Sequence, residues 1–434
     1  MVTFAQDSNI VNLHNWSMGS FSGMTWANVG AAACVVLPAL AAAFLLCGCG
    51  GAKEEYTAEA GTAEPVVKEV TMAVVGDIMV HDYQYEEAYD PATGTYDFMH
   101  NFQDVKRYFE GYDFVIGNLE LTFGGPDKEY ASFPCFNTPD SFLDAVKDAG
   151  FNLLTTANNH SMDTGEAGLK RTISQLDAYD IDHVGTYASQ EARDTIYTKE
   201  VNGINFAFVS ATYGTNGIPV PEDYLVNHMD DTLMADITKA QELADVVVVL
   251  PHMGNEYETV PNDIFVEWAD SMFAAGADIV LASHPHVLQR MEYRQVDHGD
   301  GIHDGFIIYS LGNFISSQTT PPRNASIVLQ LTVEQVADHP AEVKEVSFVP
   351  IWTQFRNAEN ENHFVVRSVY EMLTLSESER YQVVRPKDYE RLKEIHEETA
   401  CFLLDKNIPL EQIQDEYVSV SYTHLRAHET SQDL

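Results

Sequence analysis

Short apolar segments that end in polar residues recur along the middle of the chain, and they restrict its fold more than any other feature. Each is an uninterrupted apolar, β-branched run followed by Asp, Asn, His or Gly. The segments cover residues 71–77, 113–120, 152–160, 245–256, 278–286 and 305–314. Uninterrupted apolar runs of this length are typical of strands that are buried on both faces. The pattern therefore predicts a sheet that is covered on both sides.

Amphipathic segments lie between these runs and predict helices. They cover residues 139–150, 165–180 and 262–278. In the last of them Phe265, Trp268 and Met272 recur at helical spacing, and a glycine follows. Strands that alternate with helices predict an α/β fold with its functional groups at the carboxyl ends of the strands. The polar residues that end the apolar runs stand at this position.

The chain is predicted to have five regions. These are a signal and lipobox segment (1–49), a flexible tether (50–69), an α/β metal-site domain (70–357), an acidic helical extension (358–417) and a tail that is not native (418–434). Near the end of the α/β domain, residues 325–336 and 342–354 predict an antiparallel strand pair.

The N-terminal region is predicted to be an export or anchoring signal rather than part of the fold. Its apolar run, residues 29–47, leads into Leu46-Cys47-Gly48-Cys49, which resembles a bacterial lipobox with Cys49 as the lipidated residue. We therefore expect an extracytoplasmic protein anchored to the cell membrane by lipid. An uncleaved membrane-spanning anchor and a cleaved secretory signal without lipid are the alternatives. No Lys or Arg precedes Lys53, so the positive segment that usually begins an export signal is absent from the sequence.

The charge of the chain excludes some partners. It has 66 Asp and Glu residues against 24 Lys and Arg, a formal net charge of −42 at pH 7. Such a surface repels phosphate backbones and anionic lipid, so we expect no nucleic-acid partner and no basic membrane patch. An anionic substrate would have to meet a bound cation or a local basic pocket.

The polar residues at the strand ends have the chemistry of a divalent metal site. They are Asp77, Glu120, Asn159, His160, His252, His284 and His286. Oxygen and imidazole ligands suit hard or borderline ions such as Mn, Fe or Zn. The lack of nearby thiols argues against a structural zinc site and favours an open, catalytic one. Any one of these histidines taken alone is more simply a hydrogen-bonded core residue.

Two ions would require a bridging carboxylate, because its two oxygens can reach both ions. Asp77 and Glu120 are the available residues for that position. A nearby histidine that binds no metal could then protonate a leaving group, and His160, which follows Asn158 and Asn159, suits this role.

Six ordered motifs make the chain similar to a known family. They are GDIM (76–79), GNLE (117–120), ANNHSMDTG (157–165), PHMGNEY (251–257), SHPHVLQ (283–289) and YSLGNF (309–314). From about residue 71 to residue 314 the chain resembles the CapA family of poly-γ-glutamate capsule proteins, whose core is related to calcineurin-like metallophosphoesterases. The resemblance implies a layered α/β sandwich with a metal site at the strand ends, and two divalent ions.

The resemblance also implies roles for individual residues. It makes Asp77, Asn159, His252, His284 and His286 metal ligands and His160 the catalytic acid. GNLE stands where a bridging aspartate is usual, so either Asn118 or Glu120 takes that place, and charge favours Glu120.

Further residues of these motifs are expected near the site. The histidine of the family's first motif is missing, and His81 could replace it or be a loop residue. Glu256 and Tyr257 could contact substrate or only close their strand, and Asn313 could orient the histidines. Asp163 could cap the helix that begins near Gly165 or take part in the chemistry.

Three functions are compatible with these features. The first is a metal-dependent hydrolase or transferase that acts on a capsule polymer such as poly-γ-glutamate, with membrane synthase subunits as further partners. The second is a non-catalytic lipoprotein of a polymer synthesis or export complex, which the departures in the first two motifs favour. The third is a phosphoesterase acting on small phosphate esters, an analogy of fold alone.

Overall fold

The computed structural model describes residues 65–299 and 301–419. The predicted signal segment with Cys49, most of the predicted tether and nearly all of the predicted tail lie outside these residues. In the described part of the chain, the strands form two large sheets and a small hairpin of β2 (Tyr89–Asp90) and β3 (Thr95–Tyr96).

The first large sheet has nine strands and contains the first three of the predicted apolar segments. Its main path runs β16-β15-β14-β1-β4-β5-β6, with β13 paired to β1 and β17 paired to β15. The strands are β1 (Val67–Ile78), β4 (Phe114–Leu119), β5 (Leu153–Thr155), β6 (Asp182–Val184), β13 (Asn313–Ile315), β14 (Ala325–Val336), β15 (Glu342–Arg356), β16 (Asn362–Ser368) and β17 (Tyr417–Ser419). β1, β4, β5 and β6 are parallel, whereas β14 and β15 form the predicted antiparallel pair.

The second large sheet has six strands in the order β11-β12-β10-β9-β8-β7. The strands are β7 (Tyr197–Val201), β8 (Ile204–Thr212), β9 (Val246–His252), β10 (Ile279–Leu281), β11 (Met291–Asp297) and β12 (Ile302–Ile308). The four central strands, β8, β9, β10 and β12, are parallel.

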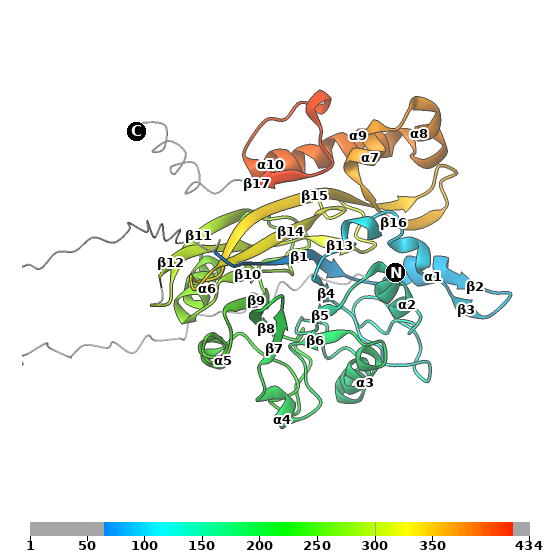
Figure 1. Cartoon of the computed structure of the whole chain (residues 1–434). Helices are drawn as coiled ribbons and strands as arrows, with labels where there is room; N and C mark the ends of the chain where they lie inside the picture. The colour runs from blue at the N-terminus through cyan, green and yellow to red at the C-terminus, as the bar shows by residue number, and fades with distance from the viewer. Residues whose placement is uncertain (1–64, 300, 420–434) are drawn as a thin grey trace, which may run out of the picture. The chain divides into compact units, whose positions relative to one another are not determined.

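Helices cover the outer faces of both sheets (Figure 1). The α-helices are α1 (Asp82–Ala88), α2 (Phe142–Ala149), α3 (Gly165–Ala178), α4 (Gln190–Arg193), α5 (Asp231–Gln241), α6 (Asp263–Ala275), α7 (Val369–Thr374), α8 (Glu377–Val383), α9 (Pro386–His396) and α10 (Phe402–Leu404). Short 3-10 helices are η1 (Met99–Asn101), η2 (Lys106–Tyr108) and η4 (Leu410–Gln412), and η3 (Glu397–Cys401) is a π-helix. The three helices predicted from amphipathic spacing correspond to α2, α3 and α6.

The side chains of each central strand alternate between two cores. In β9, Val248 packs into the core between the sheets, whereas Val249 packs against α5 and α6. In β1, Met72 faces the same inter-sheet core, and Ala73 belongs to the cluster that contains α2. Because both faces of each sheet are buried, these strands are apolar without interruption. The predicted layered α/β sandwich is confirmed.

The C-terminal part of the described chain adds both helices and sheet. Trp352 of β15 packs with Val369 of α7 and Leu392 of α9, so these helices lie against the antiparallel edge of the first sheet (Figure 1). β16 and β17, which both include residues of the region 358–417, pair with β15. Within the two described ranges, no helix combines the length and apolar character needed to cross a membrane. The apolar run 29–47 lies outside them.

A glycine allows the close contact between β1 and the segment before β13. A Cβ atom on Gly76 would lie 1.8 Å from the carbonyl oxygen of Gly312. The next residue, Asp77, donates its backbone N–H to that carbonyl at 2.9 Å and lies opposite Asn313 in the sheet. The missing side chain at residue 76 therefore sets the position of Asp77 beside Asn313.

We expect Gly76→Ala to lower the free energy of unfolding by about 3 kcal/mol, because the backbones of β1 and Gly312 must separate. Denaturant unfolding followed by circular dichroism measures this change. Gly214→Ala is the matched control, since no heavy atom lies within 4 Å of the position of its added Cβ. Equal unfolding free energies for the two variants would contradict the explanation.

Candidate metal centre

The predicted site residues come together where the carboxyl ends of strands from both sheets meet. Asp77 lies near the end of β1, Glu120 directly after β4, and His252 at the end of β9. Asn159 and His160 follow β5, while His284 and His286 follow β10. These seven side chains are all buried. The seven predicted residues therefore lie together at one edge of the fold.

Glu120 lies at the centre of the group. Its Oε1 atom is 3.7 Å from Nε2 of His252, 3.8 Å from Nε2 of His286 and 4.0 Å from Nε2 of His160. The same oxygen is buried and has no hydrogen-bond partner in the described structure. Burial, and then the nearby Asp77 carboxylate, raise the pKa of Glu120 well above its ordinary value. A cation would relieve the electrostatic cost of the ionised carboxylate at this position.

Two histidines and an asparagine gather on one side of Glu120. His252 Nε2 lies 2.7 Å from Oδ1 of Asn159 and 3.1 Å from Nδ1 of His284. Burial, followed by the neighbouring imidazoles, lowers the pKa of His252 well below its usual range and that of His284 to about 3. The rings are thus held neutral, which is the form that binds metal. Glu120, His252 and His284 form one group of donors within 4.8 Å of one another.

Asp77 and His286 form a second group with Glu120. Nδ1 of His286 lies 3.1 Å from Oδ2 of Asp77 and 3.0 Å from Oδ1 of Asn313. Glu120 belongs to both groups, as a ligand that bridges two ions must. A third group contains Glu256, which is exposed, together with His284 and His286.

Asn118 supports the two acids. Its amide donates to Oδ1 of Asp77 at 2.8 Å, and its own Oδ1 accepts from Thr155 at 3.0 Å and from Asn158 at 3.2 Å. With its oxygen already engaged twice, Asn118 is oriented to hold Asp77. Of the two residues considered for the bridging position, the geometry favours Glu120.

The loop after β10 has unusual backbone conformations. His284 has φ of 107° and His286 has φ of 59°, in the left-handed region that L-residues with a side chain rarely adopt. Strain of this kind persists where the surrounding structure enforces it, and it is common at functional sites. Here it brings both imidazoles of the SHPH motif into the same site.

His160 makes a pair with Asp163. Its Nδ1 lies 2.8 Å from Oδ2 of Asp163, and that oxygen also accepts the backbone N–H of Phe136 at 2.6 Å. Burial raises the pKa of the Asp163 carboxyl, although His160 and the Phe136 N–H counteract it. The capping interpretation of Asp163 is wrong, because its carboxylate orients His160 and the N-cap position of α3 is Thr164.

His81 lies outside the three donor groups of the site. It is buried, and its Nδ1 accepts the backbone N–H of Ser317 at 3.2 Å. Burial lowers the pKa of His81 from 6.5 to about 4. The structure therefore gives it hydrogen bonds typical of a buried loop residue.

The lowered pKa of His81 predicts a pH dependence of stability. Between pH 6.5 and about 4 the unfolded chain binds a proton at this residue that the folded chain excludes. The free energy of unfolding should therefore fall on acidification, by up to about 1.4 kcal/mol per pH unit from this group. His81→Asn keeps an acceptor for Ser317 and should reduce the slope. Urea unfolding of the metal-free parent and of metal-free His81→Asn across this pH range tests the prediction. Equal slopes of unfolding free energy against pH in the two proteins would contradict it.

Tyr213 and Arg323 lie near the site and were not identified from the sequence, whereas Tyr257 was. The ring of Tyr213 lies 4.6 Å from that of His284, and the ring of Tyr257 lies 6.0 Å from that of His286. The guanidinium of Arg323 lies 3.6 Å from the centre of the Tyr257 ring. Tyr213 follows β8, an apolar run with a polar end, so the signal that marks the other segments was also present there.

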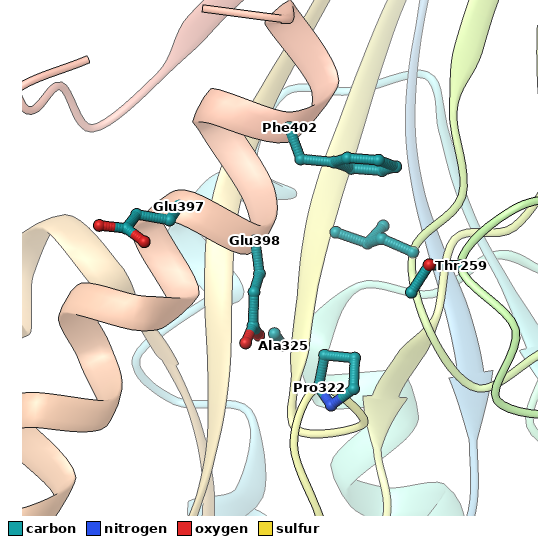
Figure 2. Close-up of a pocket in the computed structure, with 7 residues that line it drawn as sticks. Thr259, Pro322, Ala325, Glu397, Glu398 and Phe402 are labelled. Atoms are coloured by element: carbon teal, nitrogen blue, oxygen red, sulfur yellow. The ribbon is translucent and has the colours of Figure 1, made fainter. Parts of the chain in front are cut away.

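A cavity of about 300 Å³ lies next to the chain segments that carry Tyr257 and Arg323. Its wall includes Thr259, two residues after Tyr257, and Pro322, next to Arg323. Figure 2 shows Glu398 of η3 and Phe402 of α10 extending toward Pro322 and Thr259, whereas Glu397 points away. The cavity contains none of the predicted metal ligands and borders the loops that carry Tyr257 and Arg323.

The donor set suits one or two divalent ions. Asp77, Glu120, Asn159 and the three histidines supply carboxylate, amide and imidazole donors, which Mn, Fe and Zn accept. The buried Oε1 of Glu120, which makes no hydrogen bond to any described residue, is the feature that a cation would satisfy.

Comparisons with known proteins agree with the motifs. A family model described as "Bacterial capsule synthesis protein PGA_cap" matches residues 71–318. The PGA biosynthesis protein CapA of Bacillus subtilis (strain 168) is 33% identical over 290 residues, 62% of this chain and 71% of that protein. The capsule biosynthesis protein CapA of Bacillus anthracis is 34% identical over 263 residues, 58% of this chain and 61% of that protein.

Solved structures also match at low sequence identity. A 5′-nucleotidase from Candida albicans SC5314 gives a TM-score of 0.38 at 11% identity, covering 77% of this chain and 59% of that one. A hypothetical protein from Thermus thermophilus gives a TM-score of 0.37 at 15% identity, covering 65% of this chain and 98% of that one.

Proposed function

Because this chain belongs to the bacterial capsule synthesis protein PGA_cap family, we propose that it is a metal-dependent hydrolase or transferase of surface-polymer biosynthesis. The polymer proposed as its substrate is poly-γ-glutamate, because the Bacillus subtilis relative is named a PGA biosynthesis protein and the Bacillus anthracis relative a capsule biosynthesis protein. The proposed location is outside the cell membrane, with a lipid anchor at Cys49 and membrane synthase subunits as partners.

One observation carries the catalytic part of the proposal. A buried glutamate, Glu120, has an oxygen without a hydrogen-bond partner among the described residues and three imidazole nitrogens within 4.0 Å of it. In a site that served only stability, such an oxygen would accept a hydrogen bond. A buried carboxylate oxygen without one raises the free energy of the folded state. Asp77, Glu120, Asn159, His252, His284 and His286 would hold the metal.

When bound, the metal would polarise a carbonyl or phosphoryl oxygen and supply an activated water. Side chains of the protein would supply the proton transfer. Asp163 accepts the Nδ1–H of His160, which leaves Nε2 directed toward Glu120 and the reacting bond. In hydrolysis of a γ-glutamyl amide, water adds to the carbonyl carbon, the C–N bond breaks, and the leaving amine takes a proton from His160 Nε2. A proton released by the added water then returns to His160, and the products are a carboxylic acid and an amine.

The surroundings of the site also suit an anionic polymer. The whole chain carries a formal charge of −42, which repels polyglutamate at long range. Arg323, stacked on Tyr257 beside His286, offers a cation near the site that could bind a substrate carboxylate. The cation and the metal site together would overcome the repulsion locally.

We expect residues 50–434, loaded with Mn or Zn, to change the length distribution of poly-γ-glutamate, and a chelator to prevent the change. Size-exclusion chromatography with light scattering measures the chain length. Release of phosphate from small phosphate monoesters, with unchanged polymer, would instead support the phosphoesterase function. Inactivity on both substrates at full metal content would support the accessory lipoprotein. That alternative draws on the departures in the first two motifs, among them GNLE (117–120) in the place where a bridging aspartate is usual.

A further inference from the structure

A second cluster of potential ligands lies at the opposite edge of the six-stranded sheet. Asp278 directly precedes β10, His298 directly follows β11, and His303 is near the start of β12. Because β9, β10 and β12 are parallel, this is the amino end of the strands, and the metal centre described above lies at their carboxyl ends. The two clusters share no residue.

The carboxylate of Asp278 is fixed with one oxygen presented to both histidines. Its Oδ2 accepts the backbone N–H of Val247 at 2.7 Å. Its Oδ1 lies 2.8 Å from Nε2 of His303 and 3.2 Å from Nε2 of His298. Two imidazole nitrogens therefore lie close to one oxygen of this carboxylate.

The hydrogen bond from Nδ1 of His303 suits metal binding through Nε2. Its Nδ1 lies 3.2 Å from the carbonyl oxygen of Gly301, which can only accept, so Nδ1 carries the proton. In the neutral ring Nε2 then has a lone pair, directed at a carboxylate oxygen that also has lone pairs. Either a second proton or a metal ion must lie between them. A backbone carbonyl that receives Nδ1–H is the usual partner of a histidine that binds metal through Nε2.

The spacing of the donors fits a zinc ion. One oxygen and two imidazole nitrogens lie within 4.8 Å of one another. Ligand atoms bound to tetrahedral zinc at about 2.0–2.1 Å are roughly 3.3 Å apart, close to the 2.8 and 3.2 Å separations here. Only about 12% of the His298 side chain and 5% of the His303 side chain are exposed. Little movement would be needed to admit the ion.

A cavity gives access to the cluster. It has a volume of about 300 Å³ and is lined by Asp278, His298 and His303 together with Asp245, Asp338 and His339. The additional acids would attract a cation, and the cavity leaves room for water at a fourth position.

We propose that Asp278, His298 and His303 bind a Zn²⁺ ion that joins the β11–β12 hairpin to the start of β10. The donors lie in or directly next to three separate strands of the sheet, so the ion links segments that are otherwise held by backbone pairing and packing. This site is independent of the function proposed for the other edge.

Zinc binding to a variant without the first centre tests the proposal. In His284→Ala/His286→Ala full-length protein, one equivalent of Zn²⁺ should remain bound, as measured by mass spectrometry after dialysis and by calorimetric titration. Adding His298→Ala and His303→Ala should remove that equivalent and the accompanying rise in melting temperature. Co²⁺ in place of zinc should give a visible absorption spectrum that the same two substitutions abolish.

A matched control comes from a third cluster of donors, Glu87, His100 and His363, which is more exposed. His363→Ala in the same background should leave the remaining equivalent in place. The proposal is overturned if that equivalent disappears with His363→Ala, or if the background protein binds no zinc. If the His284→Ala/His286→Ala protein folds poorly, the single substitution Asp278→Asn in the parent chain is used instead. This variant must bind one equivalent of zinc less than the parent, and equal zinc content in the two proteins overturns the proposal.

Discussion

Replacing both His284 and His286 by alanine should empty the metal centre and abolish turnover. His284 belongs to the donor group with His252, and His286 to the group with Asp77, so the pair of substitutions weakens both positions. Loss of a residue that only orients a ligand typically costs 10–100-fold in metal affinity. Loss of one ligand at each position should therefore weaken binding by more than about 100-fold. Mass spectrometry of protein dialysed against trace metal measures the effect.

The control for this prediction is His183→Ala. His183 lies in β6 and contacts Asp177, away from the donor groups of the site, so metal content and turnover should stay at the parent values. Circular dichroism shows whether the double variant is folded. A folded double variant that keeps all of its metal would refute the assignment of these histidines as ligands.

The second large effect is expected at His160. His160→Ala removes the group that faces Glu120 Oε1 at 4.0 Å without removing a member of the three donor groups. We expect turnover to fall by about 10²–10⁴-fold, the usual contribution of a positioned acid, while metal content stays unchanged. Steady-state kinetics on the substrate identified by the polymer assay, with metal analysis of the same samples, provide both numbers.

Asp163→Asn separates the orienting role from the acid itself. The amide keeps an acceptor for His160 Nδ1–H but loses the charge that stabilises the protonated ring. Its kcat should lie between those of the parent and His160→Ala, with little change in KM or metal content. If His160→Ala has parental turnover, the polymer is processed without this acid and the catalytic role is wrong. If it lowers turnover only by losing metal, His160 is a ligand.

The layers of the fold could be predicted from the sequence alone. Val246 to Leu250 are apolar without interruption because alternate side chains face two different cores, and this property is readable from a few neighbouring residues. The positions of the site residues were also predictable, because each follows a strand and the carboxyl ends of parallel strands meet. β8 showed the same pattern and was missed, and with it Tyr213.

The choice between neighbouring residues needed the tertiary structure. Asn118 and Glu120 are two positions apart in one motif, and only the distances show Glu120 shared by both donor groups while Asn118 holds Asp77. Asp163 was equally suited to capping or catalysis until its contact with His160 was known.

By itself, the sequence determined the covered sheets, the strand-end position of the site and the family, since burial and local motifs are properties of consecutive residues. Only the tertiary structure decided which side chains meet. Asp278 and His303 are far apart in sequence and carry no motif, yet the parallel pairing of β10 with β12 brings them within 2.8 Å. Strand order and register depend on packing among distant segments, and no local pattern encodes them.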